Sequence, residues 1–419
     1  MNILLKSAKI SAPSNPSIHQ KKRDILIKNG TIEKIAMNIA LPGNTKEIEL
    51  DNLHISIGWF DTSVSYGEPG YEERETISDG LKVAAKSGFT DILLNPNTNP
   101  LPDSGSDIIF LKDRANGSTT NLHPIGALTV NSECKALAEL YDMQTMGAVG
   151  FYDYKKALSN SNLLKIALLY TQNFNGLVFS YPEDVAISGK GIVNEGEVST
   201  RLGLKGIPAL SEELQIARDL FILGYTGGKL HIPTISSAGA VKLIADAKKK
   251  GLDVTTSVSI HNLCLTDSEL ETFDTNYKVK PPLRTKKDSN ALLKGLQNGT
   301  IDFVTSDHRP MDIEEKRMEF DNAQYGSIGL ESAFGALHNL LGLDETISLL
   351  SKGRERFGIP TPTIEQGAIA NLTLFNPNST YSFKEEHILS KSKNAIFLDQ
   401  EMKGSVYGII NKGKIHLND

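Results

Sequence analysis

Short apolar runs alternate with amphipathic stretches through the middle of the chain. The apolar runs predict strands at residues 54–65, 89–94, 122–128, 148–151, 177–180, 229–235, 254–258 and 301–305. Helical periodicity falls between most of them, for example at 76–87, 211–223 and 238–250. This alternation is typical of a parallel sheet built from βαβ units. Eight such units that close on one another predict a (β/α)8 barrel of the TIM type. An open doubly wound sheet is the alternative, but no glycine-rich dinucleotide fingerprint follows the first strand.

Both ends of the chain have a different pattern, with short strands separated by turns. The first fifty residues predict strands at 2–10, 24–28, 31–36 and 47–50, and the last fifty at 372–375, 406–410 and 414–416. The pair Asn29-Gly30 favours a tight hairpin, because both residues tolerate positive φ. We therefore expect a small β-sandwich domain formed from residues 1–52 and 365–419, beside a barrel of residues 53–364.

Composition narrows the class of protein. The 419 residues are 39% hydrophobic and 22% charged, which is enough for one barrel of roughly 250–300 residues and a smaller domain. A net charge of -6 without a basic stripe argues against nucleic acid and anionic lipid as partners. No apolar run approaches the ~20 residues that cross a bilayer. The cysteines, Cys134 and Cys264, suit a reducing compartment. A cytoplasmic protein without membrane contact is expected.

In such a barrel the chemistry lies where the strands end. The motifs there are Gly58-Trp-Phe-Asp61, Gly67-Glu-Pro-Gly70, Asn95-Pro-Asn-Thr98, His123-Pro-Ile-Gly126, Asn194-Glu-Gly-Glu-Val198, Lys278-Val-Lys-Pro-Pro-Leu-Arg284 and Ser306-Asp-His308. In order and spacing they resemble the dihydroorotases of the amidohydrolase superfamily, almost from end to end. The resemblance implies an enzyme with one or two divalent metals, zinc in active members, which hydrolyses or closes a cyclic amide.

The resemblance breaks down at the metal ligands. Where the family has Asp-x-His-x-His, this chain has Asp61-Thr-Ser63-Val-Ser65. The histidines expected after the fifth and sixth strands are Tyr181 and Thr234. Neutral hydroxyls are poor zinc ligands, and a tyrosine ionises only near pH ~10. We therefore expect no metal and no other cofactor.

Two carboxylates remain at positions that the resemblance assigns to the metal centre. Asp307 corresponds to a metal ligand and proton-transfer base, and Asp153 to a bridging carboxylate. Alone they would hold at best a hard ion such as magnesium, and weakly. Asp307 is thus a remnant of the catalytic site, either a working base or, as we favour, a structural residue. His231 and His261 are expected to be packed residues rather than ligands.

The substrate-binding positions are also altered. Gly67 stands where the family has an arginine for the substrate carboxylate, and Lys280 where it has an asparagine. Asn97 and His308 are retained as remnants of substrate binding; the alternative for His308 is a hydrogen bond to a neighbouring loop.

Two cations are expected at the barrel mouth, Lys280 and Arg309. They either neutralise Asp153 and Asp307 in place of the missing metal, which we favour, or form a new anion pocket.

Three functions remain open. The favoured one is a non-catalytic dihydroorotase homologue of pyrimidine biosynthesis, a structural or regulatory partner, for example of aspartate transcarbamoylase. The alternative is an active cyclic amidohydrolase that interconverts N-carbamoyl-L-aspartate and dihydroorotate with an atypical site. The third is a scaffold oligomer outside pyrimidine metabolism. A homo-oligomer is expected, with a dimer as the default.

Overall fold

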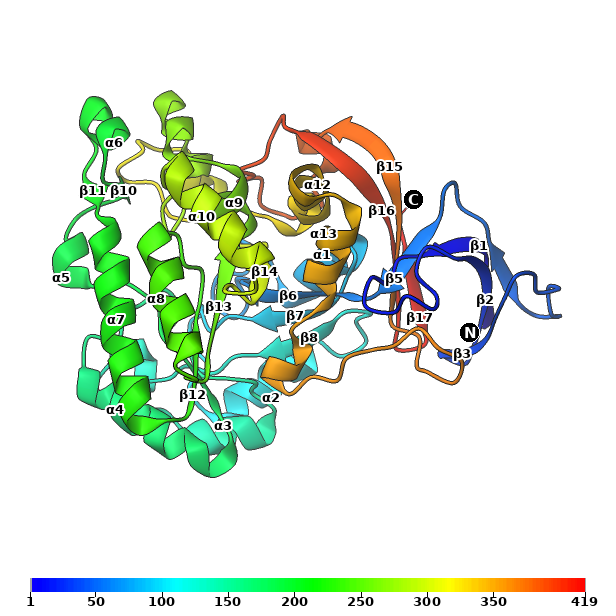
Figure 1. Ribbon diagram of the computed structural model, residues 1–419, viewed down its shortest axis with the longest axis horizontal. Helices are drawn as coiled ribbons and strands as arrows, with labels where there is room; N and C mark the ends of the chain where they lie inside the picture. Colours follow the sequence, from blue (N-terminus) through cyan, green and yellow to red (C-terminus); the bar gives the residue numbers. More distant parts are fainter. Residues whose placement is uncertain (1, 419) are drawn as a thin grey trace.

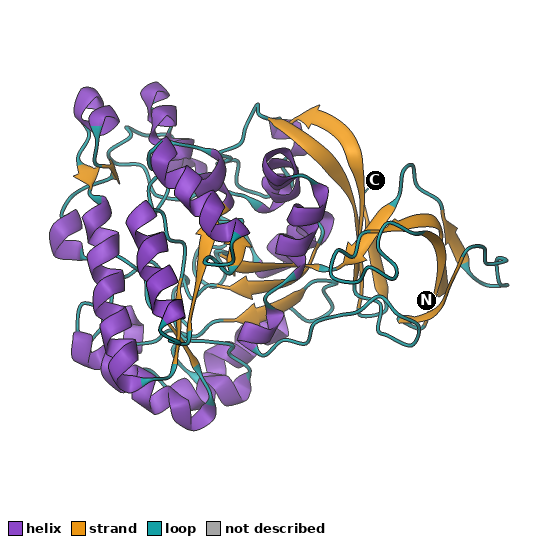
Figure 2. Cartoon of the chain, in the orientation of Figure 1, coloured by secondary structure: helices purple, strands orange, loops and turns teal. Residues whose placement is uncertain are grey.

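The computed structural model describes residues 2–418 and shows a helix-covered barrel beside a smaller β domain (Figure 1). Figure 2 shows the helices gathered around the barrel, with the strands of the small domain and both termini at the other end of the molecule. The predicted fold class, a TIM-type barrel with a β domain from both chain ends, is confirmed. In the part of the chain described, no helix has the length and apolar character needed to cross a bilayer.

Parallel strands form the wall of the barrel. They are β6 (Trp59–Val64), β7 (Phe89–Leu94), β8 (Asn121–Pro124), β9 (Leu177–Phe179), β12 (Lys229–Ile232), β13 (Val254–Ser259) and β14 (Phe303–Thr305). Phe151 fills the gap between β8 and β9 through parallel bridges to Gly126 and Val178. A parallel bridge from Val64 to His308 closes the ring. The strand predicted at 148–151 is therefore reduced to a single bridging residue.

Amphipathic helices cover the outside of the barrel. The longer ones are α1 (Ile77–Lys86), α2 (Gly105–Arg114), α3 (Leu140–Met146), α4 (Ser161–Thr171), α7 (Ala209–Thr226), α8 (Ala238–Lys249), α10 (Lys286–Gln297), α12 (Leu330–Leu341) and α13 (Leu343–Ser351). Short pieces lie in the loops: α5 (Val185–Ser188), α6 (Glu197–Leu202), α9 (Ile260–Cys264), α11 (Ile313–Lys316), β10 (Val193–Asn194) and β11 (Gly206–Ile207). Side-chain caps begin several helices, as at Thr76, whose hydroxyl accepts from the Asp79 amide.

The small domain is one sheet that joins the two ends of the chain. Its strands run in the order β17-β16-β15-β5-β1-β2-β3, with β4 paired to β1. Their bounds are β1 (Asn2–Ile10), β2 (Lys22–Lys28), β3 (Thr31–Ala36), β4 (Lys46–Ile48), β5 (His54–Ile57), β15 (Leu372–Ser382), β16 (Glu401–Asn411) and β17 (Lys414–Leu417). A core of its own includes Ile25, Ile55 and Leu372. The hairpin predicted at Asn29-Gly30 links β2 and β3, and both residues have positive φ.

The boundary between the two parts differs from the prediction. The expected strand at 54–65 is split, so that β5 belongs to the small sheet and β6 to the barrel. The chain passes from one to the other at Gly58, where a Cβ would lie 2.0 Å from Asn371 Oδ1. Because only glycine fits this crossing, the barrel begins after Gly58 rather than at residue 53.

Candidate functional site at the barrel mouth

The strand ends that form the mouth are held together by a buried carboxylate. Asp61, in the middle of β6, accepts from the backbone amides of Ser63 (3.0 Å) and Ser306 (2.9 Å) and from the Thr305 hydroxyl. Burial raises the pKa of Asp61, although these donors oppose the shift. The side chain is saturated by its own strand ends, so it aligns β6 with β14 and leaves little capacity for a ligand.

Ser63 and Ser65, which stand where the resemblance places histidines, both accept hydrogen bonds from one asparagine. The Asn95 side-chain amide donates to Ser63 Oγ at 3.0 Å and to Ser65 Oγ at 3.1 Å. Ser63 donates in turn to Asp307 Oδ1 at 3.2 Å. All four polar side chains are buried. Two hydroxyls and one amide thus form a hydrogen-bond chain that ends at Asp307, where the resemblance places two metal-binding imidazoles.

Asp307 is paired with a lysine. Lys155 Nζ lies 2.7 Å from Asp307 Oδ2 and also donates to the Lys280 carbonyl at 2.5 Å. The two side chains are only 7% and 3% exposed. The ammonium group therefore supplies the positive charge that this buried carboxylate requires.

The prediction that Lys280 and Arg309 neutralise Asp153 and Asp307 is wrong. Lys280 pairs with Glu183 at 2.7 Å, and the Arg309 guanidinium lies 5.6 Å from the centre of the Tyr154 ring. Neither neutralises Asp307, because Lys155 already does so. The sequence does place Lys155 directly after the bridging segment, but adjacency alone could not show that it turns inward.

Asp153 is satisfied by its neighbouring loop. Its Oδ1 accepts from the amides of Leu128 and Thr129, each at 3.0 Å, and its Oδ2 accepts from the Thr129 hydroxyl at 2.5 Å. Burial raises the pKa of Asp153 against these hydrogen bonds. It acts here as a loop-fixing acceptor, and no side-chain cation pairs with it in the described residues.

Tyr181 and Thr234 replace histidines on the opposite side of the mouth. Tyr181 is buried, burial raises its pKa well above the usual value, and Lys280 Nζ lies 5.6 Å from its ring centre. Thr234 has a φ of 49°, and its buried hydroxyl has no hydrogen-bond partner among residues 2–418. The cavity between Tyr181, Lys280 and the buried Arg284 measures only about 10 Å³. That is no more than one water molecule needs.

The two retained residues, Asn97 and His308, form hydrogen bonds within the protein. Asn97 donates from its side-chain amide to the Tyr66 carbonyl at 2.9 Å. His308 is fully buried, with Nε2 3.1 Å from Glu75 Oε2, while Nδ1 accepts from the Gly329 amide at 3.2 Å. The loop-bonding alternative for His308 therefore describes the geometry. The assignment of Asn97 and His308 to substrate binding stays a prediction.

Gly67 leaves no room for the arginine that the resemblance places at this position for substrate binding. A Cβ built at Gly67 would lie 1.8 Å from the Tyr71 carbonyl oxygen and 3.2 Å from that of Glu75. An arginine at this position is incompatible with the local backbone. The chain also lacks, at this point, the bidentate donor that suits a carboxylate.

The donors at the mouth do not fit a zinc ion. Zinc takes imidazole nitrogen, thiolate or carboxylate in sets of three or four. Across residues 2–418, no three His, Cys, Asp or Glu side chains cluster closely enough to hold a metal. The positions Ser63, Ser65, Tyr181 and Thr234 offer neutral hydroxyls, and a lysine binds the carboxylate of Asp307.

Arg284 is a residue of the site that the sequence alone did not single out. Its guanidinium donates to Ser236 Oγ (2.8 Å), Asn194 Oδ1 (2.9 Å) and the Ile207 carbonyl (3.1 Å). Glu212 lies 3.8 Å away, and both charges are 3% exposed. Arg284 therefore fixes the long loop carrying β10 and β11 over the mouth. The motif was visible in the sequence, but its partners lie 48 to 90 residues away.

Two buried histidines make the fold sensitive to acid. Burial lowers the pKa of His261 to about 4, and that of His231 well below its usual value. As the pH falls, the unfolded chain therefore binds protons before the folded chain does. The stabilising contribution of these two neutral histidines is full above pH ~6.5 and decreases toward pH ~4, with about 2 kcal/mol lost at pH ~5 through His261 alone. Urea unfolding across this range should show the loss, and His261→Asn should reduce its slope. An unchanged slope in this variant would contradict the assignment.

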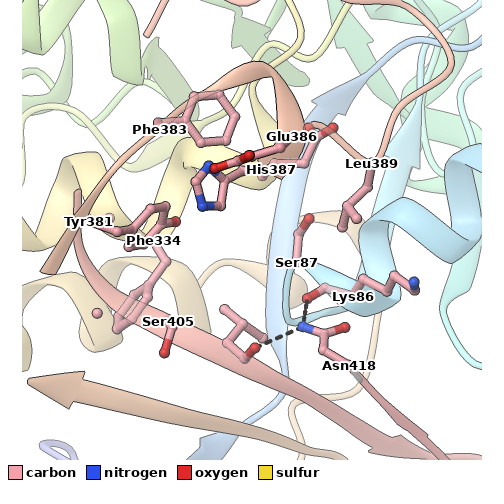
Figure 3. Close-up of a pocket in the computed structure, with 14 residues that line it drawn as sticks. Lys86, Ser87, Phe334, Tyr381, Phe383, Glu386, His387, Leu389, Ser405 and Asn418 are labelled. Carbon is pink, nitrogen blue, oxygen red and sulfur yellow. Dashed lines mark hydrogen bonds between the residues drawn. The ribbon is translucent and has the colours of Figure 1, made fainter. Parts of the chain in front are cut away.

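A larger cavity lies away from the mouth. It has a volume of about 480 Å³ and is bounded by α12, the end of α1 and the β15–β16 region. In Figure 3, Phe383 and His387 line one side and Lys86 and Asn418 another. Glu331 also lines it, but one oxygen of that carboxylate accepts from Ser390 and the other is buried. None of the residues that the resemblance assigns to catalysis reaches this cavity.

Comparison with known proteins agrees with this architecture. A family model described as "Dihydro-orotase-like" matches residues 54–240. The chain is 38% identical to a dihydroorotase of Syntrophus aciditrophicus over 99% of both chains, and 36% identical to one of Pelotomaculum thermopropionicum over 100% and 99%. An L-hydantoinase (dihydropyrimidinase) from Arthrobacter aurescens shares the fold, with a TM-score of 0.85 at 19% identity over 100% and 97% of the chains. With a fold of the hydantoinase kind and full-length relatives named dihydroorotase, this chain belongs to the dihydroorotase family of the amidohydrolase superfamily.

Proposed function

We propose that this dihydroorotase-family protein does not hydrolyse a cyclic amide at a metal centre and acts instead as a structural or regulatory partner. The observation that carries the proposal is the buried pair of Lys155 and Asp307, 2.7 Å apart. A cation of the chain itself holds the carboxylate that would bind metal and transfer protons. Metal binding would require this pair to separate inside the barrel, which costs several kcal/mol.

The substrate side of the mouth supports the same proposal. Gly67 leaves no room for the arginine that would bind a substrate carboxylate, and the cavity beside Tyr181 and Lys280 is about 10 Å³. Sites for small molecules commonly enclose about 300 Å³ or more. Gly67 therefore offers no carboxylate clamp, and the cavity beside Tyr181 and Lys280 has no room for a ring.

The identity of the binding partner rests on the family resemblance alone. We propose aspartate transcarbamoylase, within cytoplasmic pyrimidine biosynthesis. Purified chain mixed with that enzyme from the same organism should elute as a complex in size-exclusion chromatography, and should change its rate or its oligomeric state. Separate elution at micromolar concentrations would exclude this partner.

The second candidate is an active dihydroorotase, which interconverts N-carbamoyl-L-aspartate and dihydroorotate. The comparisons favour it over the first candidate, because the curated relatives that match over the whole chain carry that name. The site would then have to work without the imidazoles at positions 63 and 65.

Zinc content and turnover distinguish the two candidates. For the first, we expect protein purified without chelators to contain far less than one zinc per chain. Added zinc should produce no dihydroorotate hydrolysis above the buffer rate, because hydroxyls donate weakly to zinc. Elemental analysis and an absorbance assay measure both quantities.

The matched variants are Asp307→Asn and, as a control, Asp312→Asn at the partly exposed N-cap of α11, a position that asparagine also caps well. Stoichiometric zinc together with turnover that Asp307→Asn abolishes and Asp312→Asn preserves would establish the second candidate. Equal background rates in all three proteins support the first.

A further inference from the structure

The cavity of about 480 Å³ beside α12 has an aromatic wall. Tyr381 and His387 line it with their ring centres 4.9 Å apart, and the buried ring of Phe383 stacks on His387 at 6.2 Å. In Figure 3, Phe383 and His387 lie across the cavity from Ser87. Sites for small molecules commonly enclose about 300–1,000 Å³. The cavity is therefore large enough for a ligand, and its rings and charges determine which ligand it favours.

A buried carboxylate lies in the wall of the same cavity. The Glu331 side chain is 3% exposed, and its Oε1 accepts from the amide and the hydroxyl of Ser390 at 2.9 and 2.7 Å. Its Oε2 has no hydrogen-bond donor among residues 2–418. Burial and the negative charge of Glu331 raise the pKa of Tyr381. The field of this carboxylate thus reaches the aromatic wall.

The neighbours of Glu331 do not neutralise its charge. In the part of the chain that the structure describes, no lysine or arginine forms an ion pair with it, and His308 Nδ1 lies 3.9 Å away. That nitrogen already accepts from the Gly329 amide, and the other ring nitrogen faces Glu75 at 3.1 Å. Because one histidine stands between two carboxylates, at least one negative charge stays uncompensated. A buried charge of this kind favours a cation nearby.

The side chains around the cavity do not supply that cation. Lys86 lines the cavity, but in Figure 3 its side chain extends away from the rings. His387 Nδ1 accepts from the Lys384 amide at 3.0 Å, so this nitrogen carries no proton and the ring is neutral. Glu386 is exposed at the rim and adds a second negative charge. The cavity thus combines aromatic rings with a negative field.

The unused acceptors of the cavity lie too deep for a primary amine. A primary ammonium group donates three hydrogen bonds and loses affinity where they stay unmade. The acceptors without a partner among the described lining residues are Glu331 Oε2, Ser87 Oγ and Asn418 Oδ1, and all of them are buried below the cavity surface. A quaternary ammonium group has no N–H, so it needs only aromatic faces and a negative field.

We propose that this cavity binds a small quaternary ammonium solute of the choline type. Its methylated nitrogen lies against Tyr381, and Glu331 and Glu386 balance its charge. Residues 384–386 at the rim are exposed and charged, which does not suit insertion into lipid, so the ligand is a free solute. The site is separate from the barrel mouth and does not depend on either candidate function.

Two probes of equal shape test the role of charge. Choline and 3,3-dimethylbutan-1-ol differ only in that a carbon replaces the cationic nitrogen in the alcohol. We expect choline to bind the wild-type chain about 10-fold more tightly in isothermal titration calorimetry, because only the cation gains from the aromatic faces and the carboxylates. Ethanolamine, the primary amine, should bind more weakly than choline. Equal binding of choline and the alcohol, or no binding of choline at millimolar concentration, would overturn the proposal.

Variants locate the site. Tyr381→Leu should weaken choline binding about 10-fold, whereas Tyr381→Phe, which keeps a ring, should retain it. The matched control is Tyr225→Leu on α7, where the ring is 82% exposed and far from the cavity in sequence, and it should leave binding unchanged. Glu331→Gln keeps an acceptor for Ser390 but removes the charge, so the affinity for choline should fall toward that of the neutral alcohol. Equal choline affinities in Tyr381→Leu and Tyr225→Leu would contradict this site.

Thermal unfolding shows whether each variant is folded. Saturating choline should raise the Tm of the wild-type chain and of Tyr225→Leu, and leave that of Glu331→Gln unchanged. Glu386→Gln, at the exposed rim, is the second charge variant if Glu331→Gln does not fold, and it should also weaken choline binding. An unchanged affinity in Glu386→Gln would then count against the proposal.

Vesicles distinguish a free solute from a lipid headgroup. Phosphatidylcholine vesicles should not sediment the wild-type chain, and they should not compete with choline in calorimetry. Co-sedimentation that choline displaces would assign the cavity to a lipid headgroup and overturn the assignment to a free solute.

Discussion

Replacing Lys155 by methionine should lower the free energy of unfolding by about 3–5 kcal/mol, because it leaves the Asp307 carboxylate buried without its counter-charge. Lys155 is 7% exposed and Asp307 3% exposed, so water cannot take over the role of the ammonium group. Urea unfolding at neutral pH measures the effect. The loss should exceed that of any surface lysine, for which changes stay within about 0.5 kcal/mol.

The neighbouring Lys156 is the matched control, since its side chain is exposed. Lys156→Met should leave stability nearly unchanged. In the double variant Lys155→Met/Asp307→Asn both charges are gone, and most of the loss should be recovered. If Lys155→Met and Lys156→Met behaved alike, Lys155 would not be the counter-ion of Asp307.

Replacing Arg354 by methionine should cost a similar amount, about 3–5 kcal/mol. Arg354 is fully buried and donates to Asp91 Oδ2 at 3.0 Å and to the Gly58 carbonyl at 2.7 Å. It thereby connects the segment after α13 to β7 and to the crossing between the two sheets. Burial raises the pKa of Asp91, but the hydrogen bond from His123 and the cation of Arg354 hold it below its usual range.

The lowered pKa of Asp91 sets the pH at which this effect appears. The contribution of the ionised carboxylate is present above pH ~3.8 and disappears as the pH falls through the folded-state pKa. Denaturant unfolding at pH 7 should therefore show the full loss. Arg201→Met is the control, because Arg201 and its partner Glu271 are 51% and 55% exposed and such surface pairs contribute about 1 kcal/mol or less. Equal losses in the two variants would contradict the role given to Arg354.

Much of the fold follows from local pattern. Strand β7 and helices α1 and α8 lie within two residues of their predicted bounds, because apolar periodicity and capping residues mark them. The split between β5 and β6 could not be predicted in this way. The run 54–65 is apolar on both sides of Gly58, and only tertiary contacts with Asn371 and Thr90 show that the chain changes sheets there.

The sequence predicted which residues lie at the barrel mouth, but it did not predict which side chains they contact. Strand ends placed Ser63, Asp307 and Tyr181 at one mouth, because parallel strands present their carboxyl ends together. The side chain that neutralises Asp307 depends on how the backbone turns after Phe151. Lys155 has a φ of 53°, a backbone conformation that the surrounding sequence does not predict. Long-range charge pairing of this kind emerges only from the assembled fold.

The steric situation at Gly67 bears on any attempt to convert this chain into a zinc hydrolase. Grafting histidines at positions 63 and 65 changes side chains alone, but an arginine at 67 must also displace the carbonyl group of Tyr71. The turn from 67 to 71 would have to be redesigned first. An engineering route that begins with this loop, and adds ligands afterwards, is the one that the backbone permits.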